Sequence, residues 1–427
     1  MWMTIARRGC VWPCLLALCA VASAQDAQVD ANAVEITLNE AFARTLARNP
    51  ELVVLGYQRA GLEGALTQAR LLPNPELDIQ LQDALGTNSF NALDQSELTI
   101  SLAWFLERGV RERRVDAAEA GVSLVDADAD VLRLDIAAET ARRYIQCLAF
   151  QARLAWSLEA VELARETIDA VAVRVNAGRA PAAELARAEA ELARTELIEE
   201  DYEHELLSAR YLLGAQWGET EPDFGLVAGD VLSLPVLEPF AAIAARMQQN
   251  PDLERYASQE RLYQAELSLA EARARPPWRL SGGLRRIEAT DDFALVGAIS
   301  IPLAVRNRNE GQIATARANL ARTAAERTAA EVRIETTLFA LHQELNHYLQ
   351  TAGRLRRDIV PRLEQALVDT RRAFELGRYS YLEWQTVQSE LLQANASLLE
   401  NSISAHSIAI EIERLSGVAL APAITAQ

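Results

Sequence analysis

Residues 176–192 read NAGRAPAAELARAEAEL, and residues 375–391 read ELGRYSYLEWQTVQSEL. One shift of about 200 positions aligns a Gly-Arg pair and two glutamates in the two stretches. The aligned pairs are Gly178 with Gly377, Arg179 with Arg378, Glu184 with Glu383, and Glu191 with Glu390. Because a helix-to-helix reversal favours a glycine in the left-handed region, each stretch predicts a tight turn between two helices. Self-similarity at a fixed offset indicates that one structural unit occurs twice.

Two further matches occur in the same order at about the same offset. They are Asn49-Pro50-Glu51-Leu52 with Asn250-Pro251-Asp252-Leu253, and Ile100-Ser101-Leu102 with Ile299-Ser300-Ile301. We therefore expect a first repeat over 25–235 and a second over 236–427, joined by the Gly- and Pro-rich segment 214–239. In each repeat a short helix should end at Asn-Pro, because the residue before proline disfavours the α-helical region. A second helix should follow and end at the next prolines.

Beyond those prolines, apolar residues recur with a period of two, which is typical of β-strands. The pattern predicts strands at about 76–85 and 96–105 in the first repeat, and at about 277–287 and 292–302 in the second. Strands of about ten residues are long enough to cross a membrane when they are tilted. The sequence therefore predicts one hairpin in each repeat.

A very long helical stretch rich in Ala, Leu, Glu and Arg follows each hairpin, at about 108–175 and 309–376. At 1.5 Å per residue each helix would be roughly 100 Å long, longer than any helix inside a compact domain. Returning helices are expected over 182–213 and 381–415, after the Gly-Arg turns. The helix before each hairpin and the returning helix together match the long helix in length. We therefore expect them to stack end to end beside it.

Residues 1–24 have the features of an export signal, with a basic start, an apolar run and a cleavage site at Ala22-Ser23-Ala24. A lipoprotein signal with Cys19 as the modified residue is the alternative. The chain has a formal charge of −18, which argues against a nucleic-acid binder. After the signal, no stretch reaches the roughly 18 apolar residues that a membrane-spanning helix needs. Cys147 would be the one cysteine left, which excludes an internal disulfide.

Four strands cannot close a barrel, and open sheet edges are not viable in lipid because their backbone groups stay unpaired there. The chain must therefore complete a barrel with strands from other copies of itself. Two copies would give eight strands with an interior filled by side chains, and three would give twelve strands around a lumen. The residue pattern alone leaves this number open.

The duplicated layout resembles the TolC-like outer membrane factor family over nearly the whole mature chain, and within it the CzcC-like heavy-metal efflux branch. The stretches that carry the resemblance are ARLLPNPELDIQ from Ala69, ISIPLAVRNRNEGQIATARANL from Ile299, and the two Gly-Arg hairpins. The resemblance implies a mainly α fold with a membrane β-barrel part, completed in a homotrimer as one twelve-stranded barrel and an α-helical tunnel. It also implies docking onto a periplasmic adaptor and an inner-membrane RND-type, proton-driven pump.

The resemblance further implies a location in the outer membrane, with the tunnel in the periplasm, and export of divalent heavy-metal cations. Drug or organic-solute efflux and type I secretion are alternatives for the same fold. A soluble periplasmic coiled-coil adaptor is the alternative from another class, although it has no use for two lipid-facing hairpins. No Ser-His-Asp order, phosphate loop or paired-carboxylate motif indicates an enzyme, and no cofactor is expected.

The Gly-Arg turns Gly178-Arg179 and Gly377-Arg378 are the leading candidates for the periplasmic tip that meets the adaptor. Capping of helix ends by the arginines is the alternative, since cations commonly lie at helix C-termini. Glu184 and Glu383 lie one to two turns into the returning helices. Repeated by symmetry, they would form acidic rings at a gate, as charged rings do in cation-conducting pores. A solvated helix face is the simpler interpretation.

Five aromatic residues near the predicted strand ends suggest a girdle at the lipid headgroup level. They are Phe90, Trp104, Phe105, Trp278 and Phe293. In a soluble sheet the same residues would form a core. The histidines, His204, His342, His347 and His406, are scattered over helical stretches, and no metal site is predicted because such a site needs converging ligands.

Overall fold

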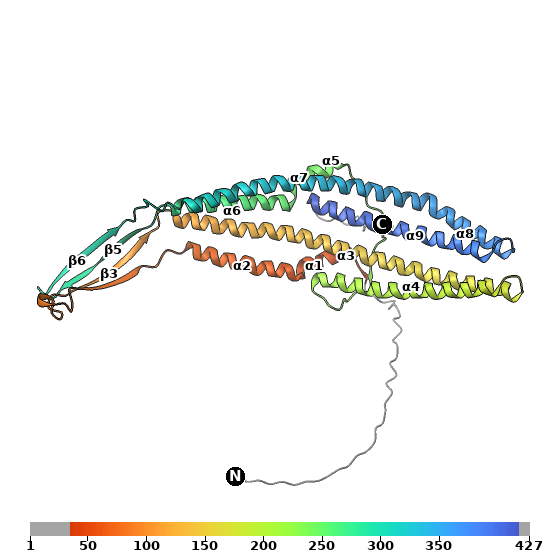
Figure 1. The fold of residues 1–427 in the computed structure, drawn as a ribbon, viewed down its shortest axis with the longest axis horizontal. Helices are drawn as coiled ribbons and strands as arrows, with labels where there is room; N and C mark the ends of the chain where they lie inside the picture. Colours follow the sequence, from red (N-terminus) through yellow and green to blue (C-terminus); the bar gives the residue numbers. More distant parts are fainter. Residues whose placement is uncertain (1–34, 418–427) are drawn as a thin grey trace, which may run out of the picture.

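The computed structural model describes residues 35–417, so the predicted signal peptide, its cleavage after Ala24 and the alternative at Cys19 lie outside the described residues. Figure 1 shows an elongated rod with a β-sheet at one end and two helical hairpins at the other. Long helices and a small antiparallel sheet make up the described chain, which confirms the expected fold class. Within this range no helix has the length and apolar character of a membrane span.

The two repeats share their main helices and their hairpin in the same order, whereas the short strands β1 and β4 occur only in the first repeat and the long helix is divided only in the second. The first has β1 (Glu35–Ile36), α1 (Leu38–Arg48), α2 (Pro50–Arg70), β2 (Glu76–Gln82), β3 (Glu97–Leu106), α3 (Val110–Asn176), α4 (Ala182–Gly214) and β4 (Leu226–Val227). The second has α5 (Phe240–Arg246), α6 (Pro251–Arg273), β5 (Trp278–Ile287), β6 (Asp292–Ser300), α7 (Glu310–Arg354), α8 (Val360–Glu375) and α9 (Tyr381–Ser416).

Two elements differ from the sequence-based expectation for physical reasons. Strand β2 ends at Gln82 rather than near residue 85, because Asp83 and Leu85 adopt left-handed φ angles of 52° and 57°. The second long helix is not uniform, since a π-helical turn (Leu355–Ile359) separates α7 from α8. Pro361 explains this turn, because proline has no N–H to donate and its ring crowds the preceding helical turn.

The duplicated Asn-Pro pairs join helices end to end. Asn49 caps α2 by accepting a hydrogen bond from Glu51 N (2.9 Å), and its Nδ2 donates to Gln216 O beyond the end of α4 (2.8 Å). Asn250 does the same in the second repeat, with Asp252 N at 2.8 Å and Leu415 O at 2.6 Å. In each repeat one asparagine therefore stacks a shorter helix on the returning helix, and this pair runs beside the long helix (Figure 1).

The middle of the rod holds a buried apolar core around the two-stranded parallel sheet β1–β4. The Tyr144 hydroxyl of α3 lies 3.0 Å from Ile36 O, and the Gln151 side chain pairs with both backbone groups of Val227. Cys147 is buried in the same core, and burial raises the pKa of its thiol to about 12. Leu399 and Ile410 of α9 also belong to this core, so it joins the two repeats at mid-length.

Candidate functional site

The four-stranded antiparallel sheet has the order β2-β3-β5-β6, so β3 and β5 join the two repeats and β2 and β6 are its edges. Residues directly opposite in an antiparallel pair lie on the same face. The register pairs Ile79 with Ile100, Ile100 with Leu284, and Leu284 with Leu295. One apolar face therefore runs across all four strands. It is open, since Leu77 is 65% exposed and Leu295 is 88% exposed.

The opposite face of the sheet is polar and its charges are paired. Arg279 on β5 lies 3.2 Å from Asp78 on β2. Arg285 lies 2.7 Å from Glu97 and donates to the Thr99 hydroxyl at 3.0 Å. Gly283 also lies on this face, where an added Cβ would meet Ile100 O and would stand 2.6 Å from Ser101 Cα. Glu76 on the same face also lies 3.4 Å from Arg279, so two arginines pair with three acids there. This combination of an apolar face and a polar face with paired charges suits a wall between lipid and water.

The five aromatic residues singled out in the sequence do not all share one face. Trp104 and Trp278 lie on the apolar face at the helix-side end of the sheet, and Phe293 lies on it at the other end. Phe90 lies in the loop between β2 and β3. Phe105 pairs with Arg279, which places it on the polar face, because side chains alternate along a strand. The register therefore brings Trp104, Trp278 and Phe293 to the apolar face of the sheet, but not Phe105.

Both Gly-Arg pairs form the turns at the far end of the rod. Gly178 and Gly377 have φ angles of 69° and 73°, and nothing lies within 4 Å of an added Cβ at either position. The backbone N–H of Arg179 donates to Arg174 O, and that of Arg378 donates to Ala373 O, each at 2.9 Å. These bonds cap α3 and α8 through the backbone. The side chains of Arg179 and Arg378 are in exposed positions.

A residue that the sequence comparison missed joins the two hairpins. Arg174, in the last turn of α3, donates from Nη1 to Phe374 O at 2.8 Å and to Tyr379 O at 3.2 Å. Its guanidinium carbon also lies 4.3 Å from the centre of the Phe374 ring. These contacts bind the end of the first hairpin to the turn of the second. No repeat signal marks this residue, because Ala373 occupies the aligned position in the second copy.

Further contacts between the hairpins lie about two helical turns from Arg174, on the side away from the Gly-Arg turns. Glu166 on α3 pairs with Arg371 on α8 at 2.9 Å, and Gln388 on α9 donates to the Thr167 hydroxyl at 3.1 Å. Between them lies a small buried cluster of Val171, Ala188, Phe374, Tyr381 and Trp384. The tip is therefore one packed unit with polar contacts along its side.

The two candidate gate glutamates have different surroundings. Glu383 forms a capping box at the start of α9, where its Oε2 accepts from Ser380 N at 2.7 Å and from the Ser380 hydroxyl at 2.9 Å. These hydrogen bonds hold the pKa of Glu383 below its ordinary value. Pro181 stands at the corresponding cap of α4 and provides no side-chain bond. The Glu184 Oε2 atom is buried and has no hydrogen-bond partner among the described residues.

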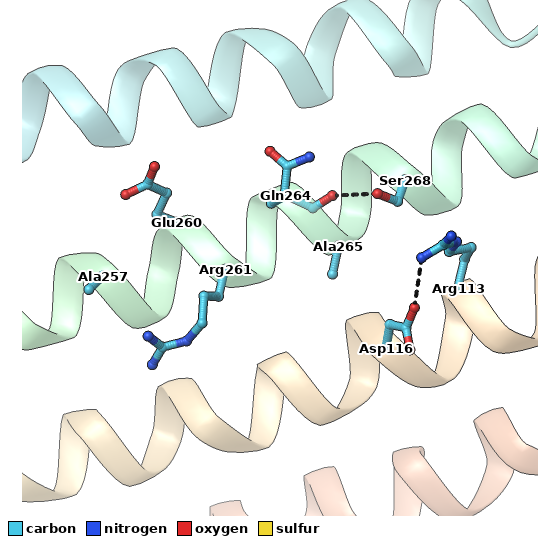
Figure 2. A pocket seen from close by; sticks show the side chains of 8 residues that line it. All are labelled: Arg113, Asp116, Ala257, Glu260, Arg261, Gln264, Ala265 and Ser268. Atoms are coloured by element: carbon cyan, nitrogen blue, oxygen red, sulfur yellow. Dashed lines mark hydrogen bonds and ion pairs between the residues drawn. The ribbon is translucent and has the colours of Figure 1, made fainter.

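A hollow of about 530 Å³ lies between α3 and α6, lined by two residues from α3 and six from α6 (Figure 2). Its polar side chains bond within their own helices, as Arg113 does with Asp116 at 3.2 Å and Ser268 with Gln264 O at 3.0 Å. No converging polar set lines it. Between residues 35 and 417, no three His, Cys, Asp or Glu side chains are grouped as metal ligands would be.

The histidines in the described chain lie in different environments. His406 is buried with its Nε2 3.1 Å from Val231 O, and His342 Nε2 lies 2.9 Å from Glu238 O. His204 and His347 are exposed on α4 and α7. These four residues therefore belong to different surroundings along the rod.

The outer membrane efflux protein family matches residues 41–219 of this chain. The cobalt-zinc-cadmium resistance protein CzcC of Cupriavidus metallidurans is 26% identical over 383 residues, covering 90% of this chain and 90% of that protein. The nickel-cobalt-cadmium resistance protein NccC of Alcaligenes xylosoxydans xylosoxydans is 26% identical over 303 residues, covering 70% of this chain and 67% of that protein. These matches confirm the resemblance expected from the sequence.

The fold is also similar to that of a solved outer-membrane channel. The open-state crystal structure of the MtrE outer membrane channel of Neisseria gonorrhoeae gives a TM-score of 0.70 at 16% identity, and the match covers 89% of each chain. At this identity the similarity concerns the fold.

Proposed function

We propose that this chain, a member of the outer membrane efflux protein family, is the outer-membrane channel of a tripartite efflux system that exports divalent heavy-metal cations. The apolar face of the sheet carries this proposal. It is continuous over four strands and open, and it lies at one end of a helical rod too long to be buried in a compact domain. Such a face is stable in lipid, so the sheet belongs in the outer membrane and the rod in the periplasm.

The unpaired edge strands β2 and β6 determine how copies of the chain assemble. Since an unpaired edge is costly in lipid, β6 of one copy pairs with β2 of the next until the ring closes. Three copies give about twelve strands, enough to surround a lumen. The polar face then lines this lumen, and its two arginines pair with three acids, which leaves the wall weakly negative.

The tip at the Gly-Arg turns is the gated end of the conduit. Arg174 holds the two hairpins of one copy together through two carbonyl groups, so the tip opens when these contacts break. Gly178, Arg179, Gly377 and Arg378 lie at the surface of this end and form the contact with a periplasmic adaptor, which links the channel to an inner-membrane RND-type pump. Glu184, with a buried and unpartnered oxygen, is the better placed gate carboxylate, whereas Glu383 caps its helix.

The cargo is inferred from the relatives, whose names refer to cobalt, zinc, cadmium and nickel resistance. We expect deletion of the gene to lower tolerance to zinc, cobalt and cadmium and to leave tolerance to a panel of dyes unchanged. Complementation with the full chain should restore metal tolerance. Unchanged metal tolerance with new dye sensitivity would favour export of organic solutes and would leave the channel function supported.

Fractionation tests the channel itself. The protein should sediment with outer membranes and need detergent for release as a trimer. Release by osmotic shock without detergent would favour the soluble adaptor alternative.

A further inference from the structure

The two ends of the sheet differ in charge. The four connections between the sheet and the helices, residues 71–75, 107–109, 274–277 and 301–309, are called here the helix-side border. They contain four arginines and one glutamate, namely Arg108, Arg275, Arg306, Arg308 and Glu107. The two loops at the other end, residues 83–96 and 288–291, contain four acids and no basic residue. Glu107 is already paired with Arg114 at 2.9 Å, so the helix-side border is strongly cationic.

Arg108 occupies an unusual backbone conformation at this border. Val110 N donates to Glu107 O at 3.1 Å, and the residues between them, Arg108 and Gly109, have φ angles of 48° and 90°. Positive φ at both central residues defines a type I′ turn, in which the first position favours Asn, Asp or Gly. An arginine there costs roughly 1 kcal/mol of backbone strain. Backbone requirements therefore do not account for the arginine.

The side chain of Arg108 provides the reason. Its guanidinium carbon lies 4.8 Å from the centre of the Trp278 ring, and Trp278 belongs to the apolar face. Trp104 is 46% exposed on the same end of that face. Among the described residues Arg108 forms no ion pair, so its hydrogen-bond donors point to no internal acid. The result is a free cation fixed at the boundary between an apolar surface and water.

Neighbouring copies leave the surroundings of Arg108 open, because Arg108 follows the central strand β3, whereas Arg308 follows the edge strand β6. β3 and β5 are the two central strands, whereas the next copies pair at β2 and β6. At a shift of 200 residues the second repeat places Arg308 where the first has Arg108, directly before another residue of positive φ, Asn309 (60°). Arg308 is exposed and likewise has no ion pair within residues 35–417. The Arg308 Nε donates to Ala304 O at 3.3 Å. Both repeats thus carry, at the helix-side border, an arginine that has no ion pair among the described residues.

We propose that Arg108 and Arg308 bind the phosphate groups of glycerophospholipids in the periplasm-facing leaflet of the outer membrane. A guanidinium matches the oxygens of a phosphate with two parallel hydrogen bonds, and tryptophan rings favour the headgroup level. Trp278 holds the Arg108 guanidinium in place before lipid arrives. This inference rests on the proposed function, because it requires the apolar face to lie in the membrane.

Native mass spectrometry of the detergent-solubilised full-length trimer tests the proposal. The probe is short-chain phosphatidylglycerol, and diacylglycerol with the same chains is the control without phosphate. We expect the wild type to retain phosphatidylglycerol but not diacylglycerol. Arg108→Gln and Arg308→Gln should each weaken retention about fivefold, since a basic group beside a lipid surface contributes about 1 kcal/mol. Arg333 is an exposed arginine on α7 with no ion pair in the described part of the chain, so Arg333→Gln should leave retention unchanged.

Arg108→Asn separates headgroup binding from a role in the turn. Asparagine suits the left-handed position, so this variant should be at least as heat-stable as the wild type and should still lose phosphatidylglycerol. Equal retention by wild type, Arg108→Gln and Arg108→Asn, or equal retention of diacylglycerol, would overturn the proposal. If these trimers still insert into bilayers and conduct, the channel function stands. If the wild-type chain neither forms trimers nor inserts into bilayers, the proposed function itself is wrong.

Discussion

Replacing Arg174 by alanine should open the tip. The substitution removes the hydrogen bonds that Arg174 donates to Phe374 O (2.8 Å) and Tyr379 O (3.2 Å). It also removes the contact of the guanidinium with the Phe374 ring, whose centre lies 4.3 Å away. Each hydrogen bond of a half-buried arginine contributes about 1 kcal/mol, and the ring contact about 0.5 kcal/mol. The loss is thus about 2.5 kcal/mol per copy, which shifts the balance between joined and separated hairpins about 70-fold toward separation.

Single-channel recording in planar bilayers measures this shift as the fraction of time spent in the high-conductance state. Arg174→Ala should raise that fraction strongly, and Arg174→Lys should give an intermediate value because it keeps the charge but lacks the planar fork. Arg179→Ala is the matched control, since its side chain is exposed five residues further along the same turn. An unchanged open fraction in Arg174→Ala, or an equal rise in Arg179→Ala, would refute the reasoning.

Three further substitutions test other parts of the rod and the sheet. Asn250→Ala removes the cap of α6 and leaves Leu415 O without its hydrogen bond from Asn250. The thermal midpoint of the trimer should therefore fall by an amount equivalent to about 2–3 kcal/mol. The control Asn176→Ala should have little effect. Gly283→Val forces a side chain against Ile100 O, which should lower the free energy of unfolding by about 3 kcal/mol and reduce trimer yield on semi-native gels. Gly282→Val should do neither, because nothing lies within 4 Å of an added Cβ there. Burial, and secondarily the nearby Glu238 charge, raises the pKa of Glu413 to about 7 from 4.5, while Arg246 opposes the shift. Because the folded state then holds a proton that the unfolded state has released, stability should fall by up to about 3 kcal/mol as pH rises from about 4.5 to about 7, and Glu413→Gln should remove this dependence from the thermal midpoint.

Much of the architecture follows from the repeat. The Asn-Pro pairs, the period-two strands and the Gly-Arg turns are local signals, because each reflects a backbone requirement of a few residues. They place the hairpins and the helix reversals, and the helix lengths predict the end-to-end stacking that Asn49 and Asn250 produce.

Side-chain contacts between the repeats were less predictable. Arg174 acts on the second hairpin from about 200 residues away, and its aligned partner Ala373 has no such role, so a search for duplicated residues passes over it. Conversely, Glu184 and Glu383 are duplicated but differ in environment, because Ser380 offers a capping box and Pro181 does not. The position of Phe105 near a strand end predicts a place in the girdle, but the strand register puts it on the polar face beside Arg279.

The two unpaired strand edges also have a genetic consequence. In the proposed ring each copy contributes both of its edges, so one copy with a distorted sheet disrupts the strand pairing on either side of it. When altered and normal chains are produced in equal amounts and mix freely in threes, only about one ring in eight contains no altered copy. Alleles that damage the sheet should therefore act dominantly over the normal gene, whereas alleles that abolish synthesis should be recessive.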